Sequence, residues 1–225
     1  MDVRIRGLLF DLWNTLLASD APVNPVLELG RRLREAGASG WLPAIEKGMM
    51  MRPLGGIDEA LPEVERAAGI VLEPQARREA ARAWQRASEK VALFSDVLPA
   101  LDRLRDRYRL GLLSNTQSFD LEFLRSSGLE ERFHSVRYSW QTALLKPDPR
   151  AFAEATAALG LQPHEVLMVG DNWRDDVSGA RAAGLRAVFI RRRGGALSHR
   201  ERPRDELFIE NLHGLERLLA AGEPL

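Results

Sequence analysis

The chain contains short apolar runs that each end in a polar residue and are separated by helical patterns. The runs are residues 3–10, 109–113, 165–169 and 186–190, with a weaker one at 133–138. Near-continuous apolar runs of this length are typical of strands buried on both faces of a parallel sheet. The helical patterns are residues 97–107, 119–126, 150–159 and 177–183. This alternation predicts an α/β fold with a doubly wound, Rossmann-like parallel sheet.

Residues 18–94 interrupt the alternation. They show no strand pattern, and their helical patterns are residues 25–36, 42–51, 63–68 and 74–94. Asn24 is placed to cap the first of these helices, with Pro25 as its first residue. A stretch of roughly 80 residues can form a small domain of its own. We therefore expect a discontinuous core of residues 1–17 and 95–225, with residues 18–94 inserted as a helical cap domain over the carboxyl ends of the strands, where such sheets bind ligands.

The charges of the chain cancel, with 32 basic against 32 acidic residues. This balance argues against a nucleic-acid or membrane-surface partner, since both favour an excess of basic residues. With no cysteine in the chain, disulfides, thiol nucleophiles and thiolate metal sites are excluded. No apolar run approaches the roughly 20 residues that cross a bilayer, and the N-terminal sequence does not read as a signal peptide. We expect a cytoplasmic protein that is a monomer or a homodimer.

Polar side chains follow the expected strands. Asp11 follows the first, Ser114 and Asn115 follow the second, and Asp171 follows the run VLMVG. The carboxyl ends of parallel strands gather at one edge of the sheet, so these residues are expected to meet there. A buried carboxylate is costly unless it is paired. Lys146, and a cation shared with Asp171, would offset the charge of Asp11.

Four segments, in the order FDLWNTL, LLSNT, LLKPDP and VGDNWRDDVSGARAAG, carry these residues. They resemble the four motifs of the haloacid dehalogenase superfamily, and the helical insertion resembles its type 1 cap. The resemblance spans essentially the whole chain. It implies a Mg²⁺-dependent hydrolase, a phosphatase of a small phosphorylated metabolite that acts through an aspartyl-phosphate intermediate.

Asp11 is the candidate nucleophile of such a reaction. Ser114 can donate a hydrogen bond to a substrate oxygen, and Asn115 is a further candidate for substrate binding. Lys146 precedes a helix that we expect to begin with Asp148 as N-cap and Pro149 as first residue. Its charge would therefore add to the positive end of the helix dipole, which favours anion binding. We count Asp11, Ser114 and Lys146 as catalytic.

The expected metal ligands are the carboxylates of Asp11, Asp171 and Asp176 and the backbone carbonyl of Trp13. An all-oxygen, carboxylate-rich set of this kind suits Mg²⁺. Asp175, next to Asp176, is expected to be the N-cap of the helix that follows.

Trp13 departs from the resemblance. In the superfamily's phosphatases this position is usually an Asp that protonates the leaving group and then activates water, and an indole can do neither. Loss of a general acid/base typically costs about 10²- to 10⁴-fold in rate. Good leaving groups should therefore be favoured, unless a residue of the cap supplies the proton. Asn14, where Gly is common, tolerates a positive φ.

Two other functions fit parts of the pattern. A 2-haloacid dehalogenase carries an aromatic Tyr where Trp13 stands, but typically has a neutral residue where this chain has Asp171, because a second carboxylate would repel a carboxylate substrate. A binding or regulatory protein would keep the metal cluster without turnover, and Trp13 would then mark the lost activity.

Some segments outside the motifs also carry expectations. Residues 17–20 and 94–97 are expected to be the hinges of the cap, with Ser95 and Asp96 starting a helix. The run Arg191-Arg192-Arg193 is expected to be a solvated loop, with phosphate binding as the alternative. Trp173 is placed to flank the metal loop, and its role is open.

Overall fold

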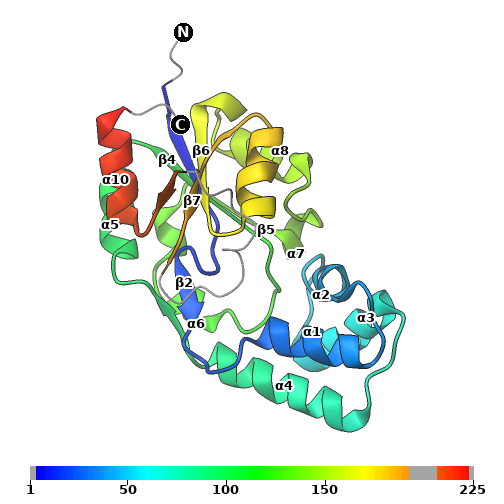
Figure 1. The fold of residues 1–225 in the computed structure, drawn as a ribbon. Helices are drawn as coiled ribbons and strands as arrows, with labels where there is room; N and C mark the ends of the chain where they lie inside the picture. Colours follow the sequence, from blue (N-terminus) through cyan, green and yellow to red (C-terminus); the bar gives the residue numbers. More distant parts are fainter. Residues whose placement is uncertain (1–3, 193–206, 223–225) are drawn as a thin grey trace.

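The structure is a computed structural model, and it describes residues 4–192 and 207–222. Its centre is a six-stranded parallel sheet with strand order β5-β4-β1-β6-β7-β8 (Figure 1). The strands are β1 (Gly7–Phe10), β4 (Arg109–Ser114), β5 (Ser135–Tyr138), β6 (Val166–Gly170), β7 (Arg186–Ile190) and β8 (Phe208–Ile209). The five expected strands are present, but the first, expected at residues 3–10, begins only at Gly7, and residue 3 lies outside the described residues.

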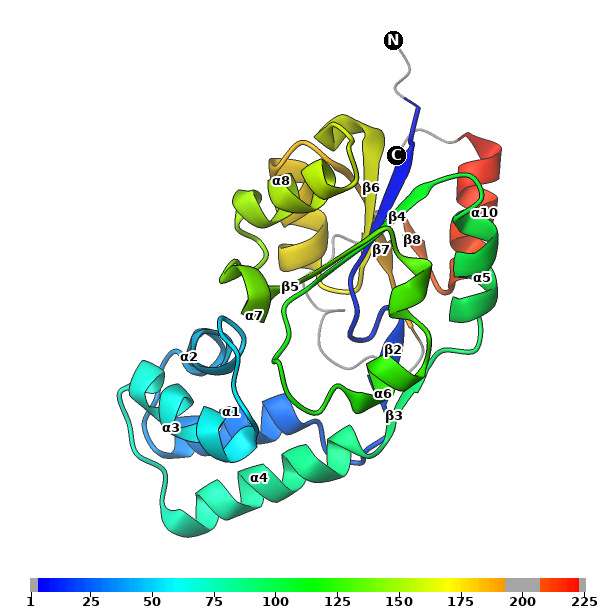
Figure 2. The same ribbon diagram turned by 180° about the vertical axis from the view of Figure 1, so that it is seen from behind.

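Helices cover both faces of the sheet (Figures 1 and 2). One face carries α5 (Val97–Leu104), α6 (Glu122–Ser126) and α10 (Leu212–Ala221), and the other carries α8 (Pro149–Ala158) and α9 (Gly179–Ala182). Leu8 and Phe10 of β1 pack in the first layer, and Leu9 packs in the second. Each of the three is at most 1% exposed. Burial on both faces explains the continuous apolar runs and confirms the doubly wound fold.

Regular helices follow the loop after β5 and the loop that contains Lys146. The short helix α7 (Ser139–Thr142) follows β5. Helix α8 begins as expected, with Pro149 as its first residue and the Asp148 side chain accepting from the Arg150 N–H. Two 3₁₀ turns, Glu130–Arg132 and Pro163–Glu165, precede β5 and β6.

The loop after β6 differs from the expectation. It enters a π-helix, Trp173–Ser178, that leads into α9, so the helix starts before residue 177. Its N-cap is Asn172, whose side-chain oxygen accepts from the Asp175 N–H at 3.0 Å. The expectation that Asp175 is the N-cap is therefore wrong, because the amide of Asn172 already satisfies that end of the helix.

The inserted helical region consists of four helices with a core of their own. They are α1 (Pro25–Glu35), α2 (Trp41–Met49), α3 (Ile57–Ala68) and α4 (Pro74–Ser88). Leu33, Ile45 and Leu61 are fully buried among them. Asn24 caps α1 as expected, accepting from Val26 N–H and Leu27 N–H. Figures 1 and 2 show these helices gathered beyond the carboxyl end of β1.

Two short strands join this region to the sheet. β2 (Leu17–Ser19) and β3 (Val91–Leu93) pair antiparallel, with Leu17 opposite Leu93. The expectation of a strand-free segment at residues 18–94 is therefore wrong. The helix expected at 74–94 ends at Ser88, because the residues that follow pair with β2. Strands of three residues are too short to show the alternation that marks a strand in sequence.

The longest described helix, α4, has 15 residues. Within the described part of the chain, no helix is both long and apolar enough to span a membrane.

Candidate active site

Asp11, Lys146 and Asp176 form a buried cluster at the carboxyl end of the sheet. Lys146 Nζ donates to Asp11 Oδ1 at 2.7 Å and to Asp176 Oδ1 at 2.6 Å. Asp11, Lys146 and Asp176 are 7%, 3% and 1% exposed. The structure thus brings Lys146 to Asp11 as the sequence predicts. The second ion pair, to Asp176, was not expected from the sequence.

The protonation of this cluster follows from burial and from its opposite charges. Burial raises the pKa of Asp11 to about 6, although the ammonium of Lys146 lowers it, and Asp176 adds to the rise. Burial lowers the pKa of Lys146, but Asp11 and Asp176 outweigh this effect and leave it above its ordinary value. Lys146 is therefore a permanent cation in the cluster at neutral pH.

The carboxylates of the cluster fit a divalent metal. One oxygen from each of Asp11, Asp171 and Asp176 lies within 4.8 Å of the other two, and Asp171 is also buried. Buried carboxylates are costly away from water unless their charge is offset. Mg²⁺ prefers such hard oxygen ligands and would offset charge on this cluster. The Trp13 carbonyl as a further ligand stays a prediction.

Gly170, the last residue of β6, makes room for Asp176. A Cβ at this position would lie 2.2 Å from Asp176 Oδ2. The same oxygen accepts a hydrogen bond from the Asn172 N–H at 3.0 Å. The strand end and the loop therefore fix the Asp176 carboxylate where Lys146 reaches it.

Asn115 holds the backbone of Lys146 in place. The Asn115 Nδ2 donates to the Lys146 carbonyl at 2.9 Å, and the Lys146 N–H donates to Asn115 Oδ1 at 2.8 Å. The nitrogen and the oxygen of the Asn115 side-chain amide therefore both bond to the Lys146 backbone. The structure thus gives Asn115 a positioning contact, and its expected contact with substrate stays a prediction.

Ser114, at the end of β4, carries a hydroxyl without a protein partner. It is 1% exposed, and its Oγ makes no hydrogen bond within the described part of the chain. Such buried unsatisfied groups are rare and call for an explanation. A substrate oxygen reaching Ser114 would supply the missing partner.

Trp13 is held by the loop after β4. Its indole Nε1 donates to Thr116 Oγ1 at 3.0 Å, and Thr116 Oγ1 donates in turn to Gln117 Oε1 at 3.1 Å. The half-buried ring also packs against the core cluster of β1. The hydrogen bond of the indole N–H therefore holds the Trp13 ring against the loop after β4. Asn14 has φ 58°, so the expected positive φ is confirmed.

Trp173 lies against the sheet. Its ring centroid is 6.5 Å from that of Phe189 in β7, and the guanidinium carbon of Arg181 lies 5.6 Å from the Trp173 ring. Trp173 thus packs on the α8 and α9 side of the molecule.

Within the arginine run after β7, Arg192 differs from both expectations. Arg192 is 4% exposed and pairs with Asp96, so it is neither a solvated side chain nor free to bind phosphate. Arg191 pairs with Glu210 and lies over the ring of Phe208. Arg193 lies outside the described residues.

Glu46, on α2, is a residue that sequence reasoning misses. It is half-buried, and burial raises its pKa to about 7, with Asp175 adding to the rise and Arg174 opposing it. Both of these residues belong to the π-helix that carries Asp176. Glu46 follows the buried Ile45 in the sequence, but helical periodicity gives no sign that the Glu46 carboxyl is itself partly buried.

The family follows from comparison with known proteins. A model of the haloacid dehalogenase-like hydrolases matches residues 5–184. The phosphoserine phosphatase of Thermus thermophilus is 40% identical over 121 residues, which are 53% of this chain and 49% of that protein. The glyceraldehyde 3-phosphate phosphatase of Methanopyrus kandleri is 37% identical over 101 residues, 44% of this chain and 43% of that protein. The matches thus cover less than half the length of these relatives.

Solved structures show the same architecture. A HAD phosphatase from Thermococcus onnurineus is 25% identical, with a TM-score of 0.62 over 98% of this chain and 100% of that one. A 2-haloacid dehalogenase from Pseudomonas syringae is 24% identical, with a TM-score of 0.61 over 97% of this chain and 100% of that one, and shares the fold. With four motif segments converging on one site and a family model that matches most of its length, the chain belongs to the haloacid dehalogenase-like hydrolases.

Proposed function

We propose that this protein is a Mg²⁺-dependent phosphatase of a small phosphorylated metabolite. The observation that carries the proposal is the buried Lys146, which bridges Asp11 and Asp176 beside a third carboxylate, Asp171. This arrangement offers a nucleophile, a fixed cation and an oxygen ligand set at one point. The phosphatases among its relatives support the same reaction class.

The residues divide the reaction between them. The Asp11 carboxylate attacks phosphorus, the bond from phosphorus to the ester oxygen breaks, and the leaving group departs from the aspartyl phosphate. Lys146 and the Ser114 hydroxyl hold the phosphoryl oxygens, and Asn115 holds Lys146. Asp11, Asp171, Asp176 and the Trp13 carbonyl would hold Mg²⁺, which when bound neutralises charge on the phosphoryl group. Water then releases inorganic phosphate from Asp11.

The third carboxylate also separates this proposal from dehalogenation. A 2-haloacid carries its own carboxylate into the site, and Asp171 would repel it there at short range. A dianionic phosphoryl group would avoid this conflict, because Mg²⁺ held by these carboxylates would neutralise its charge.

The test is release of inorganic phosphate from a metabolite panel, with Mg²⁺ or with a chelator. Phosphoserine, glyceraldehyde 3-phosphate and an aryl phosphate belong on the panel, and 2-chloropropionate serves as the dehalogenase substrate. We expect phosphate release that stops with chelator and returns with Mg²⁺. Halide release in chelator would support the dehalogenase instead, and Mg²⁺ binding without any turnover would support a binding protein.

Asp171→Asn is the variant that tests the metal site. Changes outside the first ligand shell typically cost roughly 10- to 100-fold in metal affinity, and loss of a direct ligand should cost at least as much. We expect the Mg²⁺ concentration for half-maximal rate to rise by at least about tenfold, with the melting temperature in chelator unchanged or raised. An unchanged Mg²⁺ requirement would remove Asp171 from the ligand set.

A further inference from the structure

The proposed phosphatase, on which this inference rests, must hold the Asp11 carboxylate in line with phosphorus. The residues that follow Asp11 form a tight turn between β1 and β2. In this turn the Leu17 N–H donates to the Leu12 carbonyl at 3.2 Å, and the Asn14 N–H donates to the Leu17 carbonyl at 2.6 Å. Trp13 lies inside the turn. A contact that holds the Trp13 side chain therefore also holds the backbone beside Asp11.

The Trp13 side chain binds the loop after β4. Its Nε1 donates to Thr116 Oγ1 at 3.0 Å. Thr116 is fully buried, and its hydroxyl donates in turn to Gln117 Oε1 at 3.1 Å. Gln117 is also buried, and its Nε2 donates to the Phe119 carbonyl at 3.2 Å. Three hydrogen bonds in series thus lead from the turn after Asp11 to the backbone of Phe119.

The far end of this series is fixed in the inserted helices. The Phe119 ring packs in the core of the insertion, with its centroid 5.8 Å from that of Trp84. Ser118 Oγ donates to the Leu54 carbonyl at 2.9 Å and accepts from the Leu54 N–H at 2.7 Å. The segment that starts at Ser114 therefore runs from the site to the insertion and is bonded to the turn of Asp11 on the way.

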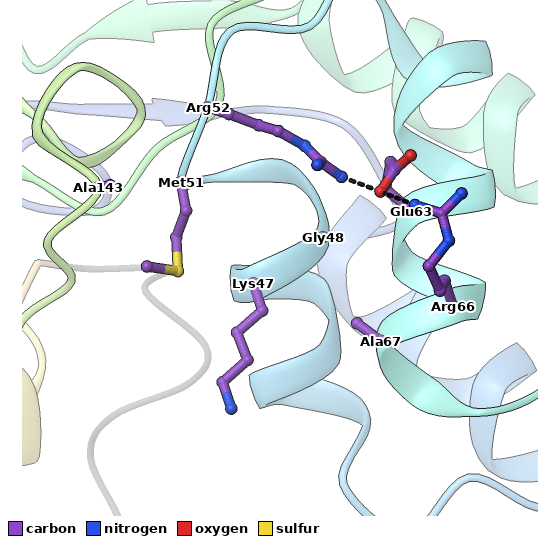
Figure 3. A pocket seen from close by; sticks show the side chains of 8 residues that line it. All are labelled: Lys47, Gly48, Met51, Arg52, Glu63, Arg66, Ala67 and Ala143. Atoms are coloured by element: carbon purple, nitrogen blue, oxygen red, sulfur yellow. Dashed lines mark hydrogen bonds and ion pairs between the residues drawn. The ribbon is translucent and has the colours of Figure 1, made fainter.

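The insertion meets the core more loosely at α2. Figure 3 shows a cavity lined by Gly48 of α2, by Met51 just after it, and by Ala143 of the loop that runs on to Lys146. Its volume is about 400 Å³. Side chains that line a cavity lack contacts across it, so α2 does not fix the position of that loop there. The segment after Ser114 makes direct bonds on both of its sides.

We propose that Trp13 is a positioning residue of this enzyme, whose hydrogen bond to Thr116 ties the turn of Asp11 to the segment between Ser114 and the insertion. The bond holds the nucleophile in register with the hydroxyl that receives a phosphoryl oxygen. Because the same segment is anchored in the insertion, the seating of the insertion and the placement of Asp11 are linked. Trp13 acts in this role through Asp11 and takes no part in proton transfer.

The test removes the bond from each side, by Trp13→Phe, by Thr116→Val and by both together. Thr116→Val keeps the shape of the side chain, and the backbone of residue 116 keeps its two bonds to Ser139 Oγ. The measured quantity is the single-turnover rate constant of aryl oxide release from an aryl phosphate at saturating Mg²⁺, which reports the attack by Asp11. A misplacement of about 1 Å can cost about 10²-fold, so we expect a smaller shift of Asp11 to lower this rate constant by roughly tenfold.

Two further readouts separate positioning from a merely structural role. Both substitutions remove the same bond, so their effects should not multiply, and the double variant should be no slower than the slower single variant. The aryl phosphate concentration for half-maximal rate should stay unchanged, because Ser114 and Lys146 are intact. With chelator present, hydrogen exchange of the Asn14 and Leu17 amides should be faster in both single variants, because the turn has lost its anchor.

Two controls keep the result specific. Thr116→Ser retains the acceptor and should keep the rate constant of the unchanged protein. Thr156→Val is the matched control and should do the same, since Thr156 is buried and its hydroxyl donates to the Ala153 carbonyl within α8. If Trp13→Phe does not fold, the comparison of Thr116→Val with Thr116→Ser still decides.

The outcomes that contradict the proposal are distinct. An unchanged rate constant in Thr116→Val, an equal loss in Thr116→Ser, or losses that multiply in the double variant would each overturn the role of Trp13. Failure of the unchanged protein to release aryl oxide or inorganic phosphate from any phosphate ester would instead overturn the proposed phosphatase, and this inference with it.

Discussion

Gly170 shows how closely single residues define the carboxylate cluster. Its backbone conformation needs no glycine, since it is a strand residue without a positive φ. The requirement is space, because Asp176 Oδ2 occupies the volume that a Cβ would take. Lys146 pairs with the other oxygen of the same carboxylate. A methyl group at residue 170 would therefore displace the Asp176 carboxylate and disturb its ion pair with Lys146.

Gly170→Ala should damage both stability and the metal site. Overpacking of this kind typically costs about 1–3 kcal/mol, and the displaced Asp176 should weaken Mg²⁺ binding. Denaturant unfolding and a Mg²⁺ titration measure the two effects. Gly56→Ala is the matched control, because a Cβ there meets no atom within 4 Å. If Gly170→Ala bound Mg²⁺ with wild-type affinity, the end of β6 would have to move enough to accommodate the methyl group without displacing Asp176.

Asp11, Ser114 and Asp171 were predictable and the setting of Glu46 was not, for one physical reason. Asp11, Ser114 and Asp171 stand at strand ends, and parallel strands bring their ends together whatever the loops do. Glu46 stands on a helix whose orientation depends on the packing of the whole insertion. The sequence of α2 alone does not show which of its side chains the packing of the insertion will bury.

At the scale of elements, a buried ion pair joins three segments near the base of the insertion. Arg192 Nη1 donates to both oxygens of Asp96 at 2.8 Å, and its Nε donates to the Thr15 carbonyl at 2.9 Å. Asp96 also accepts from the Leu212 N–H at 2.7 Å. These contacts tie the start of α5 to the end of β7 and the start of α10. Asp96 is the N-cap residue of α5, at the start of the helix as expected, but its side chain makes no capping bond there.

Asp96→Ala should therefore cost far more than the loss of a helix cap. Removing one partner of a buried pair typically costs about 3–5 kcal/mol, because the other charge stays buried and unpaired. Asp148→Ala, at the capped start of α8, should cost only about 1 kcal/mol. Denaturant unfolding of the two variants gives the comparison. The pair Asp96→Leu with Arg192→Met should recover much of the loss, and equal losses in the two single variants would contradict this role.

The elements show the same limit of sequence reasoning. Five of the six strands of the sheet were predictable, four of them from clear apolar runs, whereas the two-residue strand β8 was not. β2 and β3 were not, since Leu17 and Leu93 find each other across the whole insertion. The pair between Asp96 and Arg192 likewise joins residues 96 positions apart. Contacts of this kind depend on the finished fold.

At the scale of the whole molecule, the described contacts between the insertion and the core include two hydrogen-bonded attachments. The first is the β2–β3 ladder, which takes in residues 17–19 of one expected hinge and ends just before the other, at residues 94–97. The second is the segment between β4 and α6, which reaches the insertion helices (Figure 2). Ser118 Oγ donates to the Leu54 carbonyl at 2.9 Å and accepts from the Leu54 N–H at 2.7 Å. Opening at the first attachment alone would break the second, so the segment that begins with Ser114 should move with the insertion.

Phe119 tests this coupling. It is 6% exposed and belongs to the core of the insertion, with its ring centroid 5.8 Å from that of Trp84. Phe119→Ala should cost about 3–5 kcal/mol through the cavity it leaves, and it should free the insertion to open. We expect faster hydrogen exchange in α1–α4 than in β1, and a KM that rises more than kcat falls, because Ser114 loses its coupling to the insertion.

Phe123→Ala is the control for that experiment, since Phe123 is a half-buried aromatic in α6 that belongs to none of the core clusters. Its effects on exchange in α1–α4 and on KM should be small. Uniform exchange across the sheet and the insertion in Phe119→Ala would show that the two unfold as one unit. The insertion would then be a fixed wall of the site.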